Sequence, residues 1–292
     1  MQSEASTCRM SGAGAGEPLP GAITLEDLQS MSEAPDEEQE PPQGCDSTHR
    51  GGGGSVEDAA GEEQERLLSY WQSVGRGHQV DVPRDMAEPI QQLTRNNHPQ
   101  RRERIPFTVI NRKEKGVILN AESSSIQLGE VLYEKRHYEK AKWACVKVQE
   151  DQYEQSICLG FMKIMRYICE QNSSGLYLGM TIPIVTIVHT SETTTDITRF
   201  VTVAYYLPGE LQEQPPEPDD PDIIIEEWPP AIIYARGFRG VTNEDSIARE
   251  ISLLTELLEH PELCLQDTFI VAGYTNPAAA NRQNEIWFFE RP

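Results

Sequence analysis

The chain has 292 residues, and its 47 acidic and 25 basic side chains give a formal net charge of −22 at pH 7. This balance argues against binding to nucleic acids or to an anionic membrane surface, because contacts with phosphates depend on Lys and Arg. Residues 1–20 show no secretory signal, and no apolar run approaches the roughly 18 residues of a membrane-spanning helix, so we expect a cytoplasmic protein. The six cysteines have no paired spacing, which favours free thiols in a reducing compartment.

Residues 1–66 are predicted to form a disordered acidic tail. They hold 15 acidic and three basic residues and too few apolar ones to offset the entropy lost on folding. Residues 67–124 are expected to be a partly ordered linker. Apolar side chains over 62–74 indicate a short helix at its start, and 107–110 with 117–119 form a candidate hairpin.

Residues 125–292 are predicted to form one α+β domain, in which the order strand, helix, strand, strand occurs twice. The first helix, over 156–169, has apolar side chains at steps of four, three and four residues. The second helix, over 243–259, has its N-cap at Thr242 or Asn243. The β-rich segments lie at 133–148, 178–188, 200–207, 223–227, 231–236, 269–274 and 285–289.

Two short matches indicate an internal duplication. Residues 179–183 (GMTIP) match 273–277 (GYTNP), and residues 133–134 (YE) match 225–226 (IE). The offsets are about 94 and 92 residues, so the two halves keep register. Two such units would bury their helices against one shared antiparallel sheet.

Several of these segments resemble the SOUL/heme-binding protein family. Residues 133–143 (YEKRHYEKAKW) are similar to the family's opening strand, and 179–183 to its Met-Thr-x-Pro strand. Residues 272–277 (AGYTNP) and 284–287 (NEIW) resemble its last two strands. The resemblance extends, in order, over residues 128–291.

This resemblance implies a distorted antiparallel β-barrel with two flanking helices, built as a pseudo-twofold repeat. It further implies non-covalent, exchangeable binding of heme or another porphyrin by a cytosolic carrier, buffer or sensor. For SOUL-like members, it also implies a link to cell death through Bcl-2-type protein partners.

A porphyrin needs an apolar surface, cations for two propionates and, optionally, one ligand for the iron. The family places its porphyrin against the first helix, where Cys158, Met162, Met165 and Cys169 form a second apolar stripe beside the core face that carries Phe161. Such a stripe is typical either of burial in the core or of a helix that covers a ligand. Both interpretations stay open at this point.

The cations expected for the propionates depart from the family pattern. An arginine of the well-studied heme-binding branch aligns with Cys158, and a basic residue in the C-terminal loop is replaced within 277–280. Lys163, Arg166 and Arg282 are therefore the candidate substitutes.

His137 is the candidate iron ligand, because the SOUL-like branch carries a histidine at the matching position. Its neighbour Arg136 and four nearby lysines form a basic patch in an acidic chain, which suits carboxylate recognition. An exposed strand histidine on a solvated face is the alternative.

We expect no enzymatic activity, since the sequence contains no phosphate-binding loop, nucleophile elbow or zinc-type Cys/His spacing. The main alternative function is a protein-interaction module. Ile251, Leu254, Leu257 and Leu258 form an apolar face on the second helix, which suits a groove in a Bcl-2-type partner. Such a face is more often part of a core.

Overall fold

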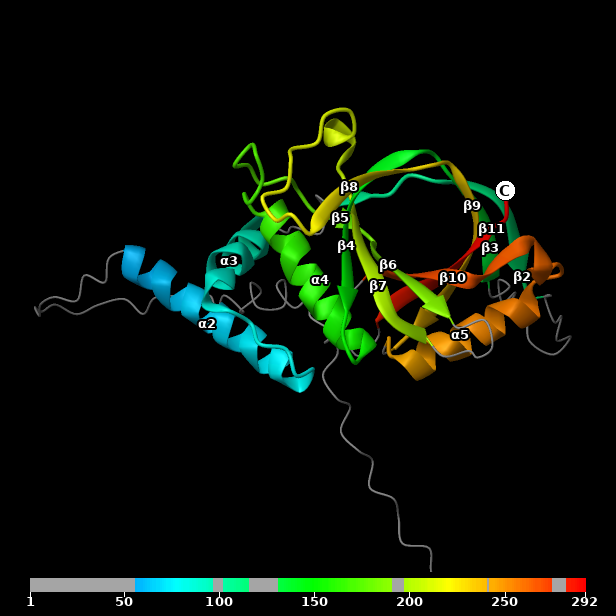
Figure 1. Ribbon diagram of the computed structural model, residues 1–292, viewed down its shortest axis with the longest axis horizontal. Helices are drawn as coiled ribbons and strands as arrows, with labels where there is room; N and C mark the ends of the chain where they lie inside the picture. The colour runs from blue at the N-terminus through cyan, green and yellow to red at the C-terminus, as the bar shows by residue number, and fades with distance from the viewer. Residues whose placement is uncertain (1–55, 97–101, 116–130, 191–196, 241, 275–281) are drawn as a thin grey trace, which may run out of the picture.

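The computed structural model describes residues 56–96, 102–115, 131–190, 197–240, 242–274 and 282–292 (Figure 1). The expected disorder of 1–55 and the 117–119 half of the candidate hairpin lie outside these residues. None of the helices in the described part of the chain combines the length and the apolar character that crossing a membrane requires.

One antiparallel sheet of nine strands dominates the fold, in the order β2-β3-β9-β11-β10-β6-β7-β4-β8. A separate parallel pair joins β1 (Glu103–Arg104) to β5 (Thr181–Ile182). The strands of the large sheet are β2 (Thr108–Glu114), β3 (Val131–Tyr138), β4 (Ala141–Gln149), β6 (Ile184–Thr190), β7 (Ile197–Tyr206), β8 (Ile223–Trp228), β9 (Ala231–Arg239), β10 (Cys264–Gly273) and β11 (Gln283–Glu290).

The sheet curls on itself but does not close into the expected barrel (Figure 1). Among the described strands, the two outer ones, β2 and β8, each pair on one side only. Tyr138 pairs with Ala231 and, in continuing register, Ala141 pairs with Trp228. Pro229 and Pro230 lie between the two ladders and have no N–H to donate, so the hydrogen bonding stops there and the sheet bends.

Strand β2 contains the first half of the candidate hairpin. It pairs with β3, with Thr108 opposite His137. It also continues through Lys113 and Glu114, where the turn of the hairpin was expected, while the expected partner 117–119 lies outside the described residues.

The internal repeat is visible as the order strand, strand, helix, strand, strand. The first unit is β3-β4-α4-β6-β7 and the second is β8-β9-α5-β10-β11, and the units meet where β6 pairs with β10. The predicted equivalence of 179–183 with 273–277 is wrong, because 179–183 precedes β6 whereas Gly273 ends β10. Gly273 pairs with Ile184, so the two segments are neighbours across an antiparallel pair and not repeat equivalents.

Helices α4 (Tyr153–Ile168) and α5 (Glu244–Leu257) cover one side of the sheet, which we call the convex face; the other side is the concave face. Helix α4 packs on β4 and β7, and α5 packs on β11. Asn243 caps α5, since its side chain accepts from the Ser246 amide at 2.9 Å and its own amide donates to the Ser246 hydroxyl.

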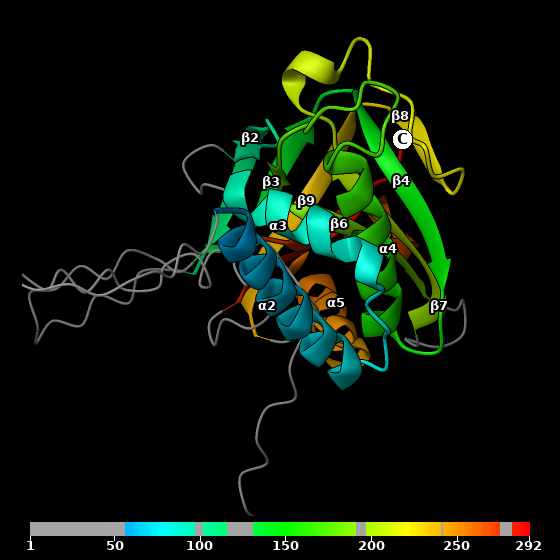
Figure 2. The same ribbon diagram turned by 90° about the vertical axis from the view of Figure 1, so that its left-hand side faces the viewer.

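Two further helices lie outside α4 (Figure 2). Helix α2 (Val56–Gly77) is longer than the expected 62–74, so the end of the predicted 1–66 tail is helical. Helix α3 (Ala87–Asn96) follows a short turn. Leu67, Leu68 and Trp71 of α2 are fully buried, and their burial stabilises a helix in an otherwise polar segment. We call α2 and α3 the N-terminal arm.

Candidate functional site

The second apolar stripe of the first domain helix, which we call the α4 stripe, is buried beneath the N-terminal arm. Its residues Cys158, Met162, Met165 and Cys169 are 1, 4, 0 and 4% exposed, and Phe161 beside them is also buried. They belong to one apolar cluster that includes Trp71, Met86, Ile90 and Leu93 of the arm and its turn. The Cys169 thiol also lies 3.4 Å from the Pro89 carbonyl oxygen. The stripe therefore belongs to the core and presents no open surface to a flat ligand.

The two cations of α4 are held by carboxylates. Lys163 hydrogen-bonds Asp222 and lies 3.5 Å from Asp220. An Nη atom of Arg166 lies 3.0 Å from the carboxylate of Asp85, in the turn before α3. The two ion pairs thus connect α4 to the segment before β8 and to the turn before α3.

Arg282 lies elsewhere, 5% exposed, directly before β11. The positive charge of Arg282 acts to lower the pKa of Glu154, at the beginning of α4. Burial and the charge of Glu244 raise that pKa by more. The structure does not bring Arg282 to the α4 stripe.

His137 is also far from the α4 stripe in the sheet. It lies on β3, between β2 and β9, whereas α4 packs on β4 and β7. Tyr138 belongs to the concave cluster, so alternation along the strand directs His137 to the opposite side. A third of its side chain is exposed, and Nδ1 lies 3.5 Å from the Glu139 carboxylate. His137 is thus a half-buried strand histidine, and its role as an iron ligand stays a prediction.

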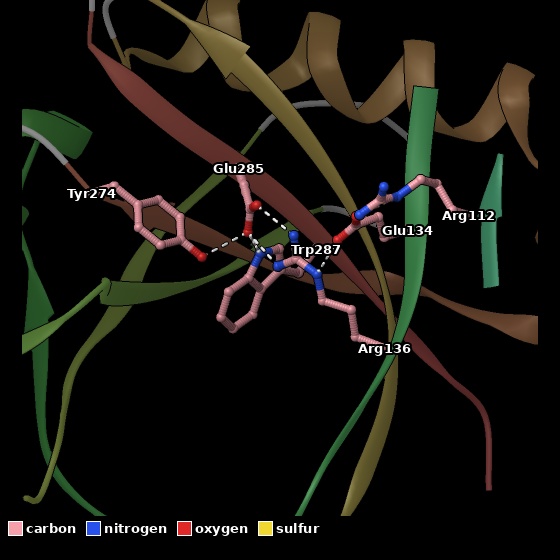
Figure 3. A network of polar contacts seen from close by, with 6 residues as sticks. All are labelled: Arg112, Glu134, Arg136, Tyr274, Glu285 and Trp287. Carbon is pink, nitrogen blue, oxygen red and sulfur yellow. Dashed lines mark hydrogen bonds and ion pairs between the residues drawn. The ribbon is translucent and has the colours of Figure 1, made fainter. Parts of the chain in front are cut away.

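Arg136 lies at the centre of a buried polar network on the concave face (Figure 3). Its two Nη atoms donate to the Glu285 carboxylate at 2.8 and 2.7 Å. The Tyr274 hydroxyl and the Trp287 Nε1 donate to the same carboxylate at 2.8 and 2.7 Å. Glu285 therefore accepts hydrogen bonds from one cation and two neutral donors. The side chain of Arg136 is only 8% exposed and is not available to a propionate.

A second carboxylate completes the network. The Nε atom of Arg136 donates to Glu134 at 2.9 Å, and Arg112 of β2 donates to Glu134 from the solvent side at 2.8 Å. Burial opposes the ionisation of Glu134, but the hydrogen bonds from the two arginines outweigh it and hold its pKa below the usual value. The chain of charges ties β2, β3 and β11 together.

A cavity of about 660 Å³ opens on the concave face next to this network. Trp143 stacks on Trp228 with ring centroids 4.4 Å apart, and Tyr138 lies 5.2 Å from Trp287. The volume is within the roughly 300–1,000 Å³ typical of small-molecule sites. We call it the aromatic cavity; its aromatic lining residues are Tyr138, Trp143, Tyr206, Trp228, Trp287 and Phe289.

Comparison with known proteins now assigns the chain to a family. Residues 122–289, more than half of the sequence, match the SOUL heme-binding protein profile. The chain belongs to this family. Human heme-binding protein 2 is 30% identical over 166 residues, which cover 54% of this chain and 78% of that protein. Bovine heme-binding protein 1 is 31% identical over 160 residues, which cover 54% of this chain and 83% of that protein.

Solved structures add no functional argument. The C-terminal domain of EcmrR aligns with 55% of this chain and 96% of that domain, at 12% identity and a TM-score of 0.40. This likeness is too distant to inform function.

The N-terminal arm lies outside the residues that match the SOUL family. The match begins at residue 122, whereas the arm ends at Asn96. The helix face that the family resemblance assigns to the porphyrin is thus covered by a segment that the family profile does not include. In the conformation seen here, the α4 stripe does not fit a heme.

The aromatic cavity of this SOUL domain fits a flat apolar body better. Among the described residues that line it, none is His, Cys or Met, the usual ligands of heme iron. Burial raises the pKa of the lining Tyr138 well above its ordinary value, which disfavours a phenolate ligand. The lining therefore offers stacking surfaces without a ready axial ligand.

Sequence reasoning missed the aromatic cavity, although a signal was present. Along β4 and β7 the side chains alternate, so that Ala144 and Tyr205 pack under α4 while Trp143 and Tyr206 face the concave side. When a helix covers one face of a sheet, aromatic residues on the other face indicate a second apolar layer.

The apolar face of α5 is part of the core. Ile251, Leu254 and Leu258 are buried in the cluster beneath the helix, with Phe269 and Phe288 of the sheet. The alternative docking face is therefore not exposed, and a Bcl-2-type partner stays a prediction.

Two carboxylates meet where α4 and α5 begin, and they make stability depend on pH. Glu244 accepts from the Tyr153 amide at 2.7 Å. Burial, together with the charge of Glu244, raises the pKa of Glu154 from 4.5 to about 7. A carboxyl whose pKa is raised by folding stabilises the protein at low pH, and this contribution is lost as the pH rises from about 4.5 to about 7.

We therefore expect the free energy of unfolding to fall across this pH range, and to fall less in Glu154→Gln. Urea unfolding of both proteins, followed by tryptophan fluorescence at several pH values, measures the difference. The same slope in both proteins would show that Glu154 is not responsible.

Proposed function

We propose that this SOUL domain binds heme or another tetrapyrrole non-covalently in the aromatic cavity, as a cytosolic carrier, buffer or sensor. The aromatic cavity is the observation that carries the proposal. It holds three of the four tryptophans of the chain, and its volume of about 660 Å³ suits a small flat ligand. A macrocycle between indole and phenol rings buries both of its faces, and stacked aromatic pairs gain roughly 0.5–1.5 kcal/mol beyond that burial.

The rim of the aromatic cavity supplies cations for carboxylates. Lys140 and Arg291 both line it. Lys140 is 68% exposed in its side chain and lies 3.7 Å from Glu227, a loose contact that a propionate can replace. Charge-assisted hydrogen bonds of this kind orient a ligand whose ring system is held by burial.

Recognition by shape rather than by iron ligation has a direct consequence. In this proposal His137 does not contact the ligand, because its side chain lies on the other face of β3. Metal-free protoporphyrin should therefore bind about as tightly as heme, within roughly threefold, since the stacking surface is the same. Heme itself, when bound, supplies the redox and gas-binding chemistry of its iron.

Titration of the full chain with heme and with metal-free protoporphyrin tests the proposal. Binding is followed by porphyrin absorbance and by quenching of tryptophan fluorescence. In Trp228→Ala, which removes one ring of the stacked pair, we expect both affinities to fall about tenfold. His137→Ala and Met162→Leu, which change the iron-ligand candidate and the α4 stripe, should leave both affinities unchanged.

The opposite pattern would contradict the proposal. If Trp228→Ala bound both porphyrins like the wild type, while His137→Ala lost heme alone, ligation by His137 would replace the aromatic cavity as the basis of binding.

A further inference from the structure

A second cleft, lined by residues of β3, β9, β11, α5 and the segment around β1, contains several arginines. It has a volume of about 590 Å³, and Arg104, Arg136, Arg236 and Arg239 all contribute to its lining. We call it the arginine cleft. Four arginines in one cleft are notable in a chain whose net charge is −22, because their mutual repulsion must be offset by partners or by a ligand.

Two of the four arginines are already paired. Arg136 is bound by Glu134 and Glu285, as described above. The Nε atom of Arg236 lies 3.3 Å from Glu250, and one of its Nη atoms donates to the Leu132 carbonyl. The two glutamates that line the cleft, Glu250 and Glu285, are therefore each matched by one arginine.

Arg104 and Arg239 form the other pair. Both are exposed, and within the described parts of the chain neither side chain has a hydrogen bond or an ion pair. Arg104 comes from β1 and Arg239 from the end of β9, so two segments far apart in the sequence contribute these arginines to the lining of one cleft. This leaves the lining with a surplus of two positive charges.

The backbone leaves room for a ligand between them. Ile233 and Ala235 face the concave side, so alternation along β9 places Gly237 and Arg239 on the same side. A Cβ atom added at Gly237 would meet nothing within 4 Å. Phe107, Ile182 and Pro183 give the cleft an apolar wall.

The buried network separates the arginine cleft from the aromatic cavity. Arg136 and Glu285 line the cleft, while Trp287 and Tyr138 line the cavity. Figure 3 shows Glu285 held between Arg136, Tyr274 and Trp287. These side chains bind one another and lie between the two chambers, which share Ile105 in their linings.

We propose that the arginine cleft binds a small anion, namely a phosphate or carboxylate group carried on a flat apolar body. The unpaired guanidinium groups of Arg104 and Arg239 donate charge-assisted hydrogen bonds to the anion. The apolar body lies over Gly237 and against Phe107 and Pro183. This site is independent of the tetrapyrrole proposal, since it uses other residues and other chemistry.

Isothermal titration calorimetry of the full chain at low ionic strength, with phenyl phosphate as the probe, tests this site. Arg104→Gln and Arg239→Gln should each weaken binding about tenfold. Arg199→Gln is the matched control, because this exposed arginine of β7 is not part of the cleft. It should bind like the wild type, and inorganic phosphate should bind more weakly than phenyl phosphate.

A filling variant gives a second, independent test. Gly237→Leu leaves every arginine in place and occupies the space of the apolar body, so we expect it to abolish phenyl phosphate binding. Porphyrin affinity should stay unchanged in all of these variants. The site would be disproved by the absence of binding at millimolar phenyl phosphate, by an equal loss in Arg199→Gln, or by full binding in Gly237→Leu.

Discussion

Glu285→Ala is expected to lower the free energy of unfolding by about 3–5 kcal/mol, because the two Nη atoms of the buried Arg136 lose their acceptor and only its Nε contact with Glu134 remains. The side chains of Arg136 and Glu285 are only 8% and 15% exposed. The substitution also removes the acceptor of the Tyr274 hydroxyl and of the Trp287 Nε1. Urea unfolding at neutral pH, followed by far-UV circular dichroism, measures the loss.

A surface ion pair provides the control for this experiment. Arg199 and Asp151 lie 2.8 Å apart, with side chains 68% and 82% exposed. Asp151→Ala should therefore change stability by less than about 1 kcal/mol. A similarly small effect of Glu285→Ala would show that the buried network does not hold the concave face together.

Trp71→Ala is expected to cost about 3–5 kcal/mol, because it leaves a large void beneath the N-terminal arm. Trp71 is fully buried in the cluster that covers the α4 stripe. Among the described residues its indole Nε1 has no hydrogen-bond partner, so Trp71→Phe should cost less than half as much. Chemical unfolding measures both losses.

Hydrogen exchange identifies where the stability is lost. In Trp71→Ala, the amides of α2 and α3 should lose protection first, since the arm makes most of its apolar contacts through this cluster. Ser69→Ala, at an exposed position of α2, should stay within about 0.5 kcal/mol of the wild type. Unchanged protection of the arm in Trp71→Ala would mean that other contacts dock it.

The regular elements of the domain were predictable because their signals are local. The helix expected over 156–169 is Tyr153–Ile168, and the expected cap at Asn243 begins α5. Strand segments followed from runs of β-branched and aromatic residues. The closed barrel was not correct, because closure depends on pairing between strands far apart in the sequence, here β2 and β8, which no local pattern specifies.

The candidate site was less predictable, because one pattern suits two environments. The α4 stripe has the same residues whether a ligand or a protein segment covers it. Leu67, Leu68 and Trp71 indicated a helix, but where that helix docks is a tertiary property. His137 and the α4 stripe are near in sequence, yet the order of the strands places them apart.

The aromatic cavity could not be predicted from the sequence for a related reason. Tyr138, Trp143, Tyr206, Trp228 and Trp287 come from five different strands, and no spacing in the sequence connects them. Only the curl of the sheet brings these rings to one concave face.

The four tryptophans allow the most direct test of where a tetrapyrrole binds. Trp143, Trp228 and Trp287 line the aromatic cavity, whereas Trp71 lies between the arm and the α4 stripe. Metal-free protoporphyrin shifts nearby signals through its ring current, so an indole N–H spectrum of ¹⁵N-tryptophan-labelled protein is recorded during a titration. We expect the three cavity signals to shift and that of Trp71 to stay. A shift of Trp71 alone, with the three others unchanged, would contradict binding in the aromatic cavity.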